Sequence, residues 1–231
     1  MNYEELERLN VNFLKDNQAW NRAVSLDIEA DLTTLDDPKK IILSISTARR
    51  NEDEIDIQKF VINDETTEEE ARIFNEFGSF CQRFRPLIFI GYGIGRFDLP
   101  ILLIKMRQLD EEFKQSGRYN SGYWAFRDAM VRSYVVDMIN PVRFEIAKAE
   151  NSPPRFVSLE YAITHKRFER LPFRRTKNIV SQMTNNSTMN KWDAIRNLWQ
   201  NNRESFNQYI EGDVHDTLLL AEELFDVKKF I

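Results

Sequence analysis

The sequence predicts an α/β fold in which a mixed β-sheet carries helices on its faces. Residues 23–62 contain three successive strand-like segments with short connections, a pattern typical of an antiparallel meander. Helix-like and strand-like segments alternate after residue 67, as they do where helices connect parallel strands. The chain of 231 residues is long enough to bury a substantial core, and we expect a single domain over residues 1–231.

The first third of the chain accounts for the meander. An amphipathic pattern at residues 3–16 predicts a short helix before it. The three strands are expected at residues 22–31, 40–49 and 53–62, where apolar and polar residues alternate. This alternation indicates strands whose two faces lie in different environments.

A helix is expected over residues 68–84. Thr67 and Glu70 have the spacing of a capping box at its start. Apolar residues recur along the segment with the helical period, and Cys81 is one of them, so we expect Cys81 in the core. Because Cys81 is the only cysteine, the sequence excludes an intramolecular disulfide and a cysteine-based zinc site.

The remaining elements are less regular. The continuous apolar run at residues 86–92 predicts a buried parallel strand. A helix at 99–108 and a strand at 132–139 follow, and the rest of the chain is mainly helical. Residues 149–156 and 182–191 are expected to be loops because Pro, Asn, Ser and Thr accumulate there.

Charge is distributed unevenly along the chain. The net charge is −5, but residues 1–80 carry −10, residues 81–200 carry +9 and residues 201–231 carry −4. A basic middle between acidic ends suits a protein that holds a polyanion with one part and collects carboxylates for metal ions with others. Uneven solvated faces are the alternative explanation. The densest basic stretch lies close to a polar loop, and we expect a mobile basic and polar segment near 166–191.

No feature of the sequence indicates a membrane protein. No apolar run approaches the roughly 18 residues of a membrane span, and the acidic N-terminus lacks the basic and apolar regions of a secretory signal. We therefore expect a soluble, intracellular protein of the cytoplasm with no membrane partner.

Four carboxylates stand at positions where they can converge. Asp27 and Glu29 alternate with Ile28 on one strand and point to the same face. Asp98 follows the carboxyl end of a buried strand, and Asp213 lies one helical turn after Tyr209. Carboxylate oxygens are the ligands that hard divalent cations take. On a solvent-facing strand, Asp27 and Glu29 would instead be ordinary surface acids.

The glycines before Asp98 suggest a second interpretation. Gly91, Gly93 and Gly95 resemble a dinucleotide-binding loop, but the third glycine comes one residue too early for that fingerprint. Near Asp213, we expect His215 at the surface, and Asp216 as an acid that supports the site.

Three segments resemble a known family when they are taken in order. "SLDIEAD", "IGYGIGRFDLPILL" and "YIEGDVHDT" are similar to the three exonuclease motifs of the proofreading domain of family-B DNA polymerases. This domain belongs to the DEDD superfamily of ribonuclease H-like 3′ to 5′ exonucleases, and the resemblance spans about residues 22–225. It implies a ribonuclease H-like, mixed five-stranded sheet with helices on both faces. Gln208 stands where one subclass has histidine, which implies the tyrosine (DEDDy) subclass.

The resemblance also implies roles for individual residues. Asp27, Glu29, Asp98 and Asp213 match the family's ligands for two divalent metal ions, Mg²⁺ or Mn²⁺. Tyr209 matches the tyrosine that orients the attacking water, and Glu29 is expected to assist it. One departure concerns substrate binding, because Gly93 replaces an Asn with which the family usually holds the terminal nucleotides.

Basic and aromatic side chains are candidates for contacts to nucleic acid. Basic residues would bind phosphates, and aromatic residues would stack on unpaired bases. The basic segment runs from Lys166 to Lys177. A solvated loop is its alternative interpretation, with Phe168 and Phe173 in the core. The candidates are Arg96, Phe97, Lys166, Arg167, Arg174 and Arg175.

The expected function is 3′ to 5′ exonuclease activity on single-stranded ends of DNA or RNA, with release of nucleoside monophosphates. The alternatives are an RNA-directed exoribonuclease and a non-catalytic nucleic-acid-binding or adaptor module. Because no polymerase domain follows Ile231, we expect a role in DNA repair or trimming, or partnership with a separate polymerase.

Overall fold

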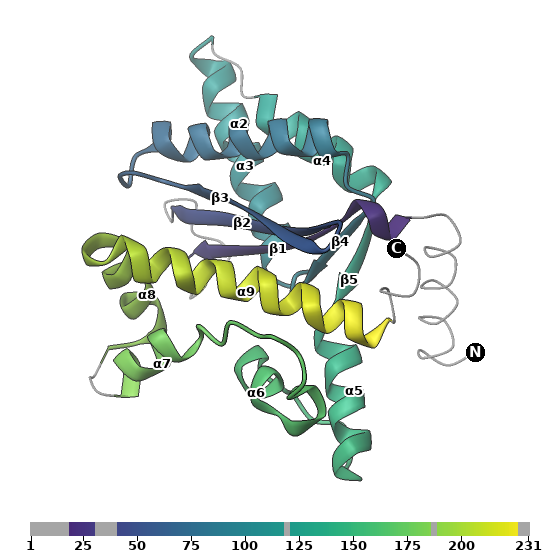
Figure 1. Ribbon diagram of the computed structural model, residues 1–231. Helices are drawn as coiled ribbons and strands as arrows, with labels where there is room; N and C mark the ends of the chain where they lie inside the picture. Colours follow the sequence, from purple (N-terminus) through teal and green to yellow (C-terminus); the bar gives the residue numbers. More distant parts are fainter. Residues whose placement is uncertain (1–18, 31–40, 118–120, 186–188, 226–231) are drawn as a thin grey trace.

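A computed structural model describes residues 19–30, 41–117, 121–185 and 189–225. The helix expected at residues 3–16 lies outside these ranges. The described strands form a five-stranded sheet with the order β3-β2-β1-β4-β5 (Figure 1). Its strands are β1 (Ala23–Ala30), β2 (Ile42–Asn51), β3 (Glu54–Val61), β4 (Ile88–Gly91) and β5 (Tyr134–Asp137).

The sheet is mixed, as the sequence predicts. Strands β1, β2 and β3 are antiparallel neighbours, whereas β4 is parallel to both β1 and β5. The β1–β4 ladder runs from Ala23 to Ser25, so β1 extends beyond its neighbour on that side. The part of β1 that carries Asp27 and Glu29 lies in this extension.

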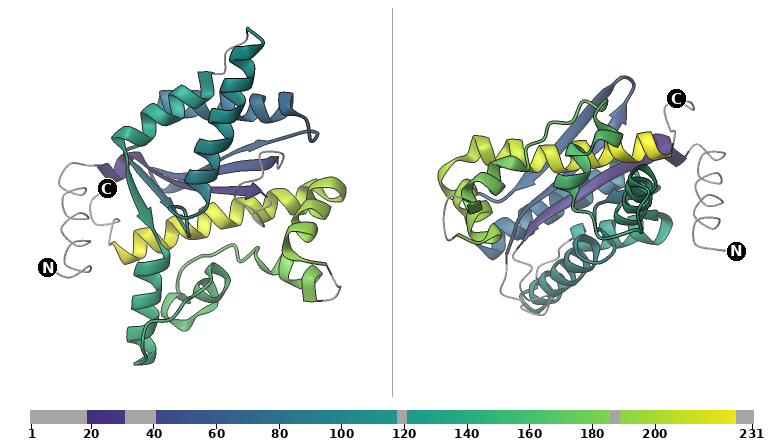
Figure 2. Two further views of the ribbon diagram at one scale, coloured as in Figure 1. Left: turned by 180° about the vertical axis from the view of Figure 1, so that it is seen from behind. Right: turned by 90° about the horizontal axis from the view of Figure 1, so that it is seen from below.

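Helices cover both faces of the sheet. In Figures 1 and 2, α2, α3 and α4 lie over one face, and α9 runs across the other. Further helices, α5 to α8, lie on the α9 side and are joined by irregular segments. The helices are η1 (Ala19–Arg22), α2 (Thr67–Phe84), α3 (Asp98–Gln115), α4 (Ser121–Arg132), α5 (Ile139–Glu150), α6 (Leu159–Thr164), η2 (Lys166–Phe168), α7 (Asn178–Asn185), α8 (Lys191–Asn201) and α9 (Arg203–Leu224).

The two faces of β1 have different chemistry. Val24, Leu26 and Ile28 are buried in an apolar cluster with α2 and α3. The intervening residues have the opposite orientation, because side chains alternate along a strand. On that opposite face the apolar Ala23 gives way to Asp27 and Glu29. The strand therefore carries the acids toward the α9 side of the sheet.

Several predicted boundaries need correction. Helix α2 is capped by Thr66, whose Oγ1 accepts a hydrogen bond from the Glu69 N–H at 3.3 Å, so the cap lies one residue before the predicted Thr67. Helix α3 continues to Gln115, because its apolar face packs on past residue 108. Residues 182–185 belong to α7 rather than to a loop, since Val180 and Met183 pack against the core and support the helix.

Other predictions are confirmed. Cys81 is buried in α2, and burial raises the pKa of its thiol to about 12. Of the loop expected at residues 149–156, residues 151–156 are irregular, whereas residues 149 and 150 form the end of α5. Among the described helices, none has both the length and the apolar character that crossing a bilayer requires.

Candidate metal and catalytic site

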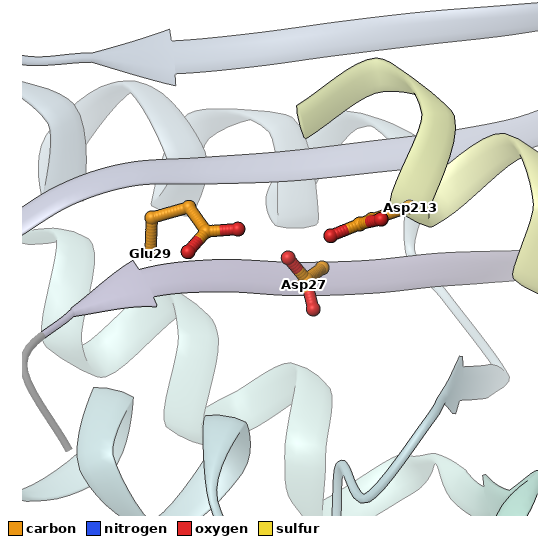
Figure 3. Close-up of side chains that lie close together, drawn as sticks. All are labelled: Asp27, Glu29 and Asp213. Atoms are coloured by element: carbon orange, nitrogen blue, oxygen red, sulfur yellow. The ribbon is translucent and has the colours of Figure 1, made fainter. Parts of the chain in front are cut away.

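Three carboxylates converge between the sheet and α9. Asp27 and Glu29 come from β1 and Asp213 comes from α9, and Figure 3 shows their oxygens directed toward one another. One oxygen from each residue lies within 4.8 Å of the other two. Three negative charges at this separation repel one another unless a cation or protons accompany them.

Asp98 reaches the same region from another element. It is the first residue of α3 and is 6% exposed. Its Oδ1 accepts a hydrogen bond of 3.2 Å from the backbone N–H of Ile28, the residue between Asp27 and Glu29. The carboxylate of Asp98 is thus held against the extension of β1, beside the three-acid cluster.

Burial raises the pKa of every acid in this group. Desolvation is the main cause, and repulsion from neighbouring acids adds to it. The pKa of Glu29 rises to about 7, and that of Asp98 to about 6 even though the Ile28 hydrogen bond lowers it. The pKa values of Asp27 and Asp213 also lie above their ordinary range.

Lys177 places a positive charge inside the cluster. Its Nζ forms an ion pair with Asp213 Oδ2 and donates a hydrogen bond of 3.1 Å to the Tyr209 hydroxyl. Burial alone would lower the pKa of Lys177, but the carboxylates around it, Asp213 first, hold its pKa well above the ordinary value. The lysine therefore remains protonated and compensates part of the negative charge.

Tyr209 lies one turn before Asp213 on α9 and is fully buried as a residue. Burial raises the pKa of its phenol well above the ordinary value, and the charge of Glu29 adds to the rise. The hydroxyl therefore keeps its proton. Because it accepts from Lys177, this proton is directed to another acceptor.

A cleft of about 880 Å³ opens beside these residues. Asp27, Glu29, Asp98, Lys177 and Tyr209 line it, together with side chains of α7 and α8. Two aromatic side chains in its wall are open to solvent. Phe97 is 42% exposed and Phe156 is 73% exposed, which leaves flat apolar surface beside the acidic cluster.

The predicted basic contacts lie in different places. Arg96 is exposed on the turn before α3. Lys166 is exposed in η2, whereas Arg167 forms ion pairs with Glu145 and Glu223. Among the described residues that line the cleft, none is one of these three.

Arg174 and Arg175 lie on the segment that leads to Lys177. The Arg174 side chain forms an ion pair with Glu211 of α9, and Arg175 is exposed. Phe168 is buried, so its ring is not open for stacking, and Phe173 is half-buried against the same apolar cluster.

Gly93 lies where the strand β4 passes into α3. Its φ of +89° is a conformation that glycine adopts most readily, and its N–H donates a 3.0 Å hydrogen bond to Asp137 Oδ1. A Cβ at this position would lie 3.4 Å from Ile139 and from Phe97. The turn supports the end of the strand, and no dinucleotide-binding helix follows in the required register.

The family model of the DNA polymerase family B exonuclease domain matches residues 4–134, more than half of the chain. The protein belongs to this family. No curated protein matches the sequence at a level that indicates relationship. The match to the family B exonuclease domain includes Asp27, Glu29 and Asp98, whereas Lys177, Tyr209 and Asp213 lie beyond it.

The acidic cluster of this family B exonuclease domain fits divalent cations, which exonuclease domains of the family use. Asp213 Oδ1 is buried, and among the described residues no group forms a hydrogen bond with it. An unpaired carboxylate oxygen in an all-oxygen donor set suits a hard cation. Lys177 pairs with the other oxygen of Asp213, so this carboxylate can bind the ammonium group and a metal cation at the same time.

Two residues of the site have no counterpart in the sequence-based prediction. The sequence places Lys177 only among several basic residues that could contact phosphate, because nothing in its local pattern marks it as buried among acids. Phe156 lies in a proline-containing segment without periodicity. It is held at the cleft because the Tyr92 hydroxyl donates a 2.5 Å hydrogen bond to the neighbouring Val157 carbonyl.

Proposed function

We propose that the protein is a metal-dependent 3′ to 5′ exonuclease of the tyrosine subclass that hydrolyses phosphodiester bonds at single-stranded ends. The observation that supports it best is the convergence of Asp27, Glu29 and Asp213 within 4.8 Å. Asp98 and Tyr209 line the same cleft. Membership of the exonuclease family supports the reaction class, and the acidic cluster is the candidate site of the reaction.

In this proposal, Asp27, Glu29, Asp98 and Asp213 hold two divalent cations, Mg²⁺ or Mn²⁺. When bound, two such cations supply the Lewis acidity that activates a water and stabilises the leaving oxygen of a phosphodiester. Desolvation disfavours an uncompensated set of charges at this site, so the acids require either protons or bound cations. Asp27 and Glu29 are held by one strand, which fixes their separation.

Tyr209 and Lys177 act on the reacting groups as a pair. The Tyr209 hydroxyl accepts from Lys177 and retains a proton with which to orient the attacking water. Glu29, which shares a face of β1 with Asp27, is expected to assist Tyr209 in positioning that water. The ammonium of Lys177 offsets negative charge that would otherwise repel the phosphate.

The cleft supports an unpaired strand end as the substrate. Phe97 and Phe156 present exposed rings beside the acids, and unpaired bases stack on such rings with about 1–3 kcal/mol each. Bases of a duplex are already stacked and are not available in this way. We propose DNA as the main substrate, with nucleoside monophosphates as products and a separate polymerase or repair complex as partner.

The test is incubation of purified protein with 5′-labelled single-stranded DNA and RNA in Mg²⁺, Mn²⁺ or chelator. We expect a metal-dependent ladder that shortens from the 3′ end and is abolished in Asp213→Asn. Glu204→Gln is the matched control, because this acid lies on the same helix but is exposed and distant from the cluster. Equal cleavage by both variants would overturn the assignment.

The two alternatives predict different results in the same assay. An RNA-directed exoribonuclease would degrade only the RNA strand, because it requires the 2′-hydroxyl. An adaptor module would bind either strand but cleave neither with any metal. The retention of all four carboxylates favours an enzyme over an adaptor.

A further inference from the structure

The loop at residues 173–177, which we name the lysine loop, ends at Lys177 and lies along α9. Its backbone is held by a carboxylate of the helix. Asp216 Oδ1 accepts the N–H of Arg174 at 2.8 Å, and Oδ2 accepts the N–H of Arg175 at 3.1 Å. Asp216 is 1% exposed, so water does not compete for these bonds.

Asp216 binds the backbone of Arg175 where this residue has an unfavourable conformation. Arg175 has a φ of +57°, in the left-handed region that residues with a side chain rarely adopt. Such a conformation costs of order 1–3 kcal/mol and persists only where surrounding contacts impose it. Two consecutive N–H groups directed at one carboxylate are such a contact.

The next residue of the lysine loop fits into a notch on α9. A Cβ at Gly212 would lie 1.7 Å from Thr176 Oγ1, so the close approach exists because residue 212 is glycine. Thr176 Oγ1 also donates a 3.3 Å hydrogen bond to the Tyr209 carbonyl. The loop and the helix are in direct contact at both points.

The contacts follow one face of α9. Gly212 and Asp213 follow Tyr209 by three and four residues and precede Asp216 by four and three, so all four lie on one face of the helix. The lysine loop therefore descends along the face that carries two residues of the site. At its end the Lys177 ammonium lies between Asp213 and Tyr209.

We propose that Asp216 is a positioning residue that sets the Lys177 ammonium between Asp213 and Tyr209 by fixing the backbone of the lysine loop. Its effect on cleavage rests on the proposed exonuclease function, whereas its effect on the placement of Lys177 does not. Asp216 itself lines no part of the cleft among the described residues. Its third contact is His215 Nδ1 at 2.8 Å, on the helix itself.

The first test measures the placement of Lys177 without reference to activity. An amine-reactive label is applied to the metal-free protein, and its incorporation is measured for each lysine by peptide mass spectrometry. In Asp216→Asn, one backbone N–H faces an amide donor instead of a carboxylate oxygen, so the loop loses its anchor. We expect labelling of Lys177 to rise about tenfold or more as the loop opens locally, while exposed Lys114 stays unchanged.

Two further variants separate this role from general damage. Glu211→Gln removes the ion pair with the Arg174 side chain but leaves the backbone bonds to Asp216, and it should leave labelling and cleavage unchanged. Gly212→Ala leaves Asp216 intact but places a methyl group where the Thr176 side chain packs against α9. Since alanine favours the helix, this variant should keep α9 and still expose Lys177 to the label. It tests the loop even if Asp216→Asn does not fold.

The second test is a double-mutant cycle on cleavage with saturating Mn²⁺. Asp216→Asn alone should lower kcat about 10- to 100-fold, the range expected when a catalytic group is displaced by about 1 Å. In a Lys177→Met background the same change should add almost nothing, because Asp216 acts through Lys177.

Unchanged Lys177 labelling in a folded Asp216→Asn variant would overturn the proposal, and so would unchanged labelling in Gly212→Ala if Asp216→Asn does not fold. A full multiplicative effect in the Lys177→Met background would also overturn it. If the wild-type protein cleaves no strand, the proposed function fails. The labelling pattern then still decides the role of Asp216.

Discussion

Glu29 makes the stability of the metal-free protein fall as the pH rises. The folded protein holds the pKa of Glu29 at about 7, chiefly by desolvation, against an ordinary value of 4.5. A carboxyl whose pKa is raised by folding binds its proton more tightly in the folded state. Its contribution to stability is therefore fully present below pH 4.5 and is lost as the pH rises through about 7.

The magnitude follows from the two pKa values. One pKa unit corresponds to about 1.4 kcal/mol, so the change from 4.5 to about 7 makes about 3 kcal/mol for Glu29 alone. The residue is 7% exposed, so solvent screens this effect little. The pKa of Asp98 is raised from 3.8 to about 6, so its contribution to stability also falls as the pH rises, over a lower pH range.

The assay is urea denaturation of chelator-treated protein between pH 4.5 and 7.5, followed by tryptophan fluorescence. Glu29→Gln removes the titrating group while preserving its shape, so the wild type should lose about 3 kcal/mol more than this variant across the range. Added Mn²⁺ binds the ionised carboxylates and should restore about 2.7 kcal/mol at a hundredfold excess over its Kd. Parallel pH profiles for the wild type and Glu29→Gln would refute the reasoning.

Three other substitutions give separate expectations. Lys177→Met leaves buried carboxylates without their cation and should destabilise the metal-free protein by about 3–5 kcal/mol, with recovery in Mn²⁺; an unchanged urea midpoint would contradict the burial of the pair. Phe156→Ala should weaken binding of single-stranded DNA by about 1–3 kcal/mol in fluorescence anisotropy while leaving the melting temperature unchanged, because the ring is 73% exposed. Phe89→Ala in the core of β4 should cost about 3–5 kcal/mol of unfolding free energy, and a smaller loss would mean that the site collapses around the cavity.

The sheet and three of its acids are predictable from local sequence. Alternation with period two reports which face of a strand is buried, and by itself it predicts that Asp27 and Glu29 share a face. Asp98 is predictable because it follows a continuous apolar run that ends at a glycine-rich turn. These signals are local, since each depends on residues close to one another in the chain.

The positive side of the site is not predictable in this way. Lys177 belongs to a run of basic residues whose members look alike in sequence, but only its side chain enters the acidic cluster. The difference arises from the packing of Thr176 against Gly212 and from the bonds of Asp216, which join segments more than 30 residues apart. The predicted cap of α2 misses Thr66 by one residue, because Thr66 and Thr67 are equivalent as sequence signals.

Strand β1 is longer than β4, and Asp98 binds the backbone of β1 where β4 has ended. Asp98 is therefore part of the sheet's hydrogen bonding as well as part of the site. Where the ladder with β4 has ended, the N–H of Ile28 finds its acceptor in the carboxylate of Asp98. One oxygen of Asp98 thus replaces the backbone carbonyl that a neighbouring strand would have supplied. The same carboxylate lies beside the acids of β1. Asp98→Asn keeps an acceptor for the Ile28 N–H and Asp98→Ala does not. The two substitutions would therefore separate the structural role of the residue from its chemical role.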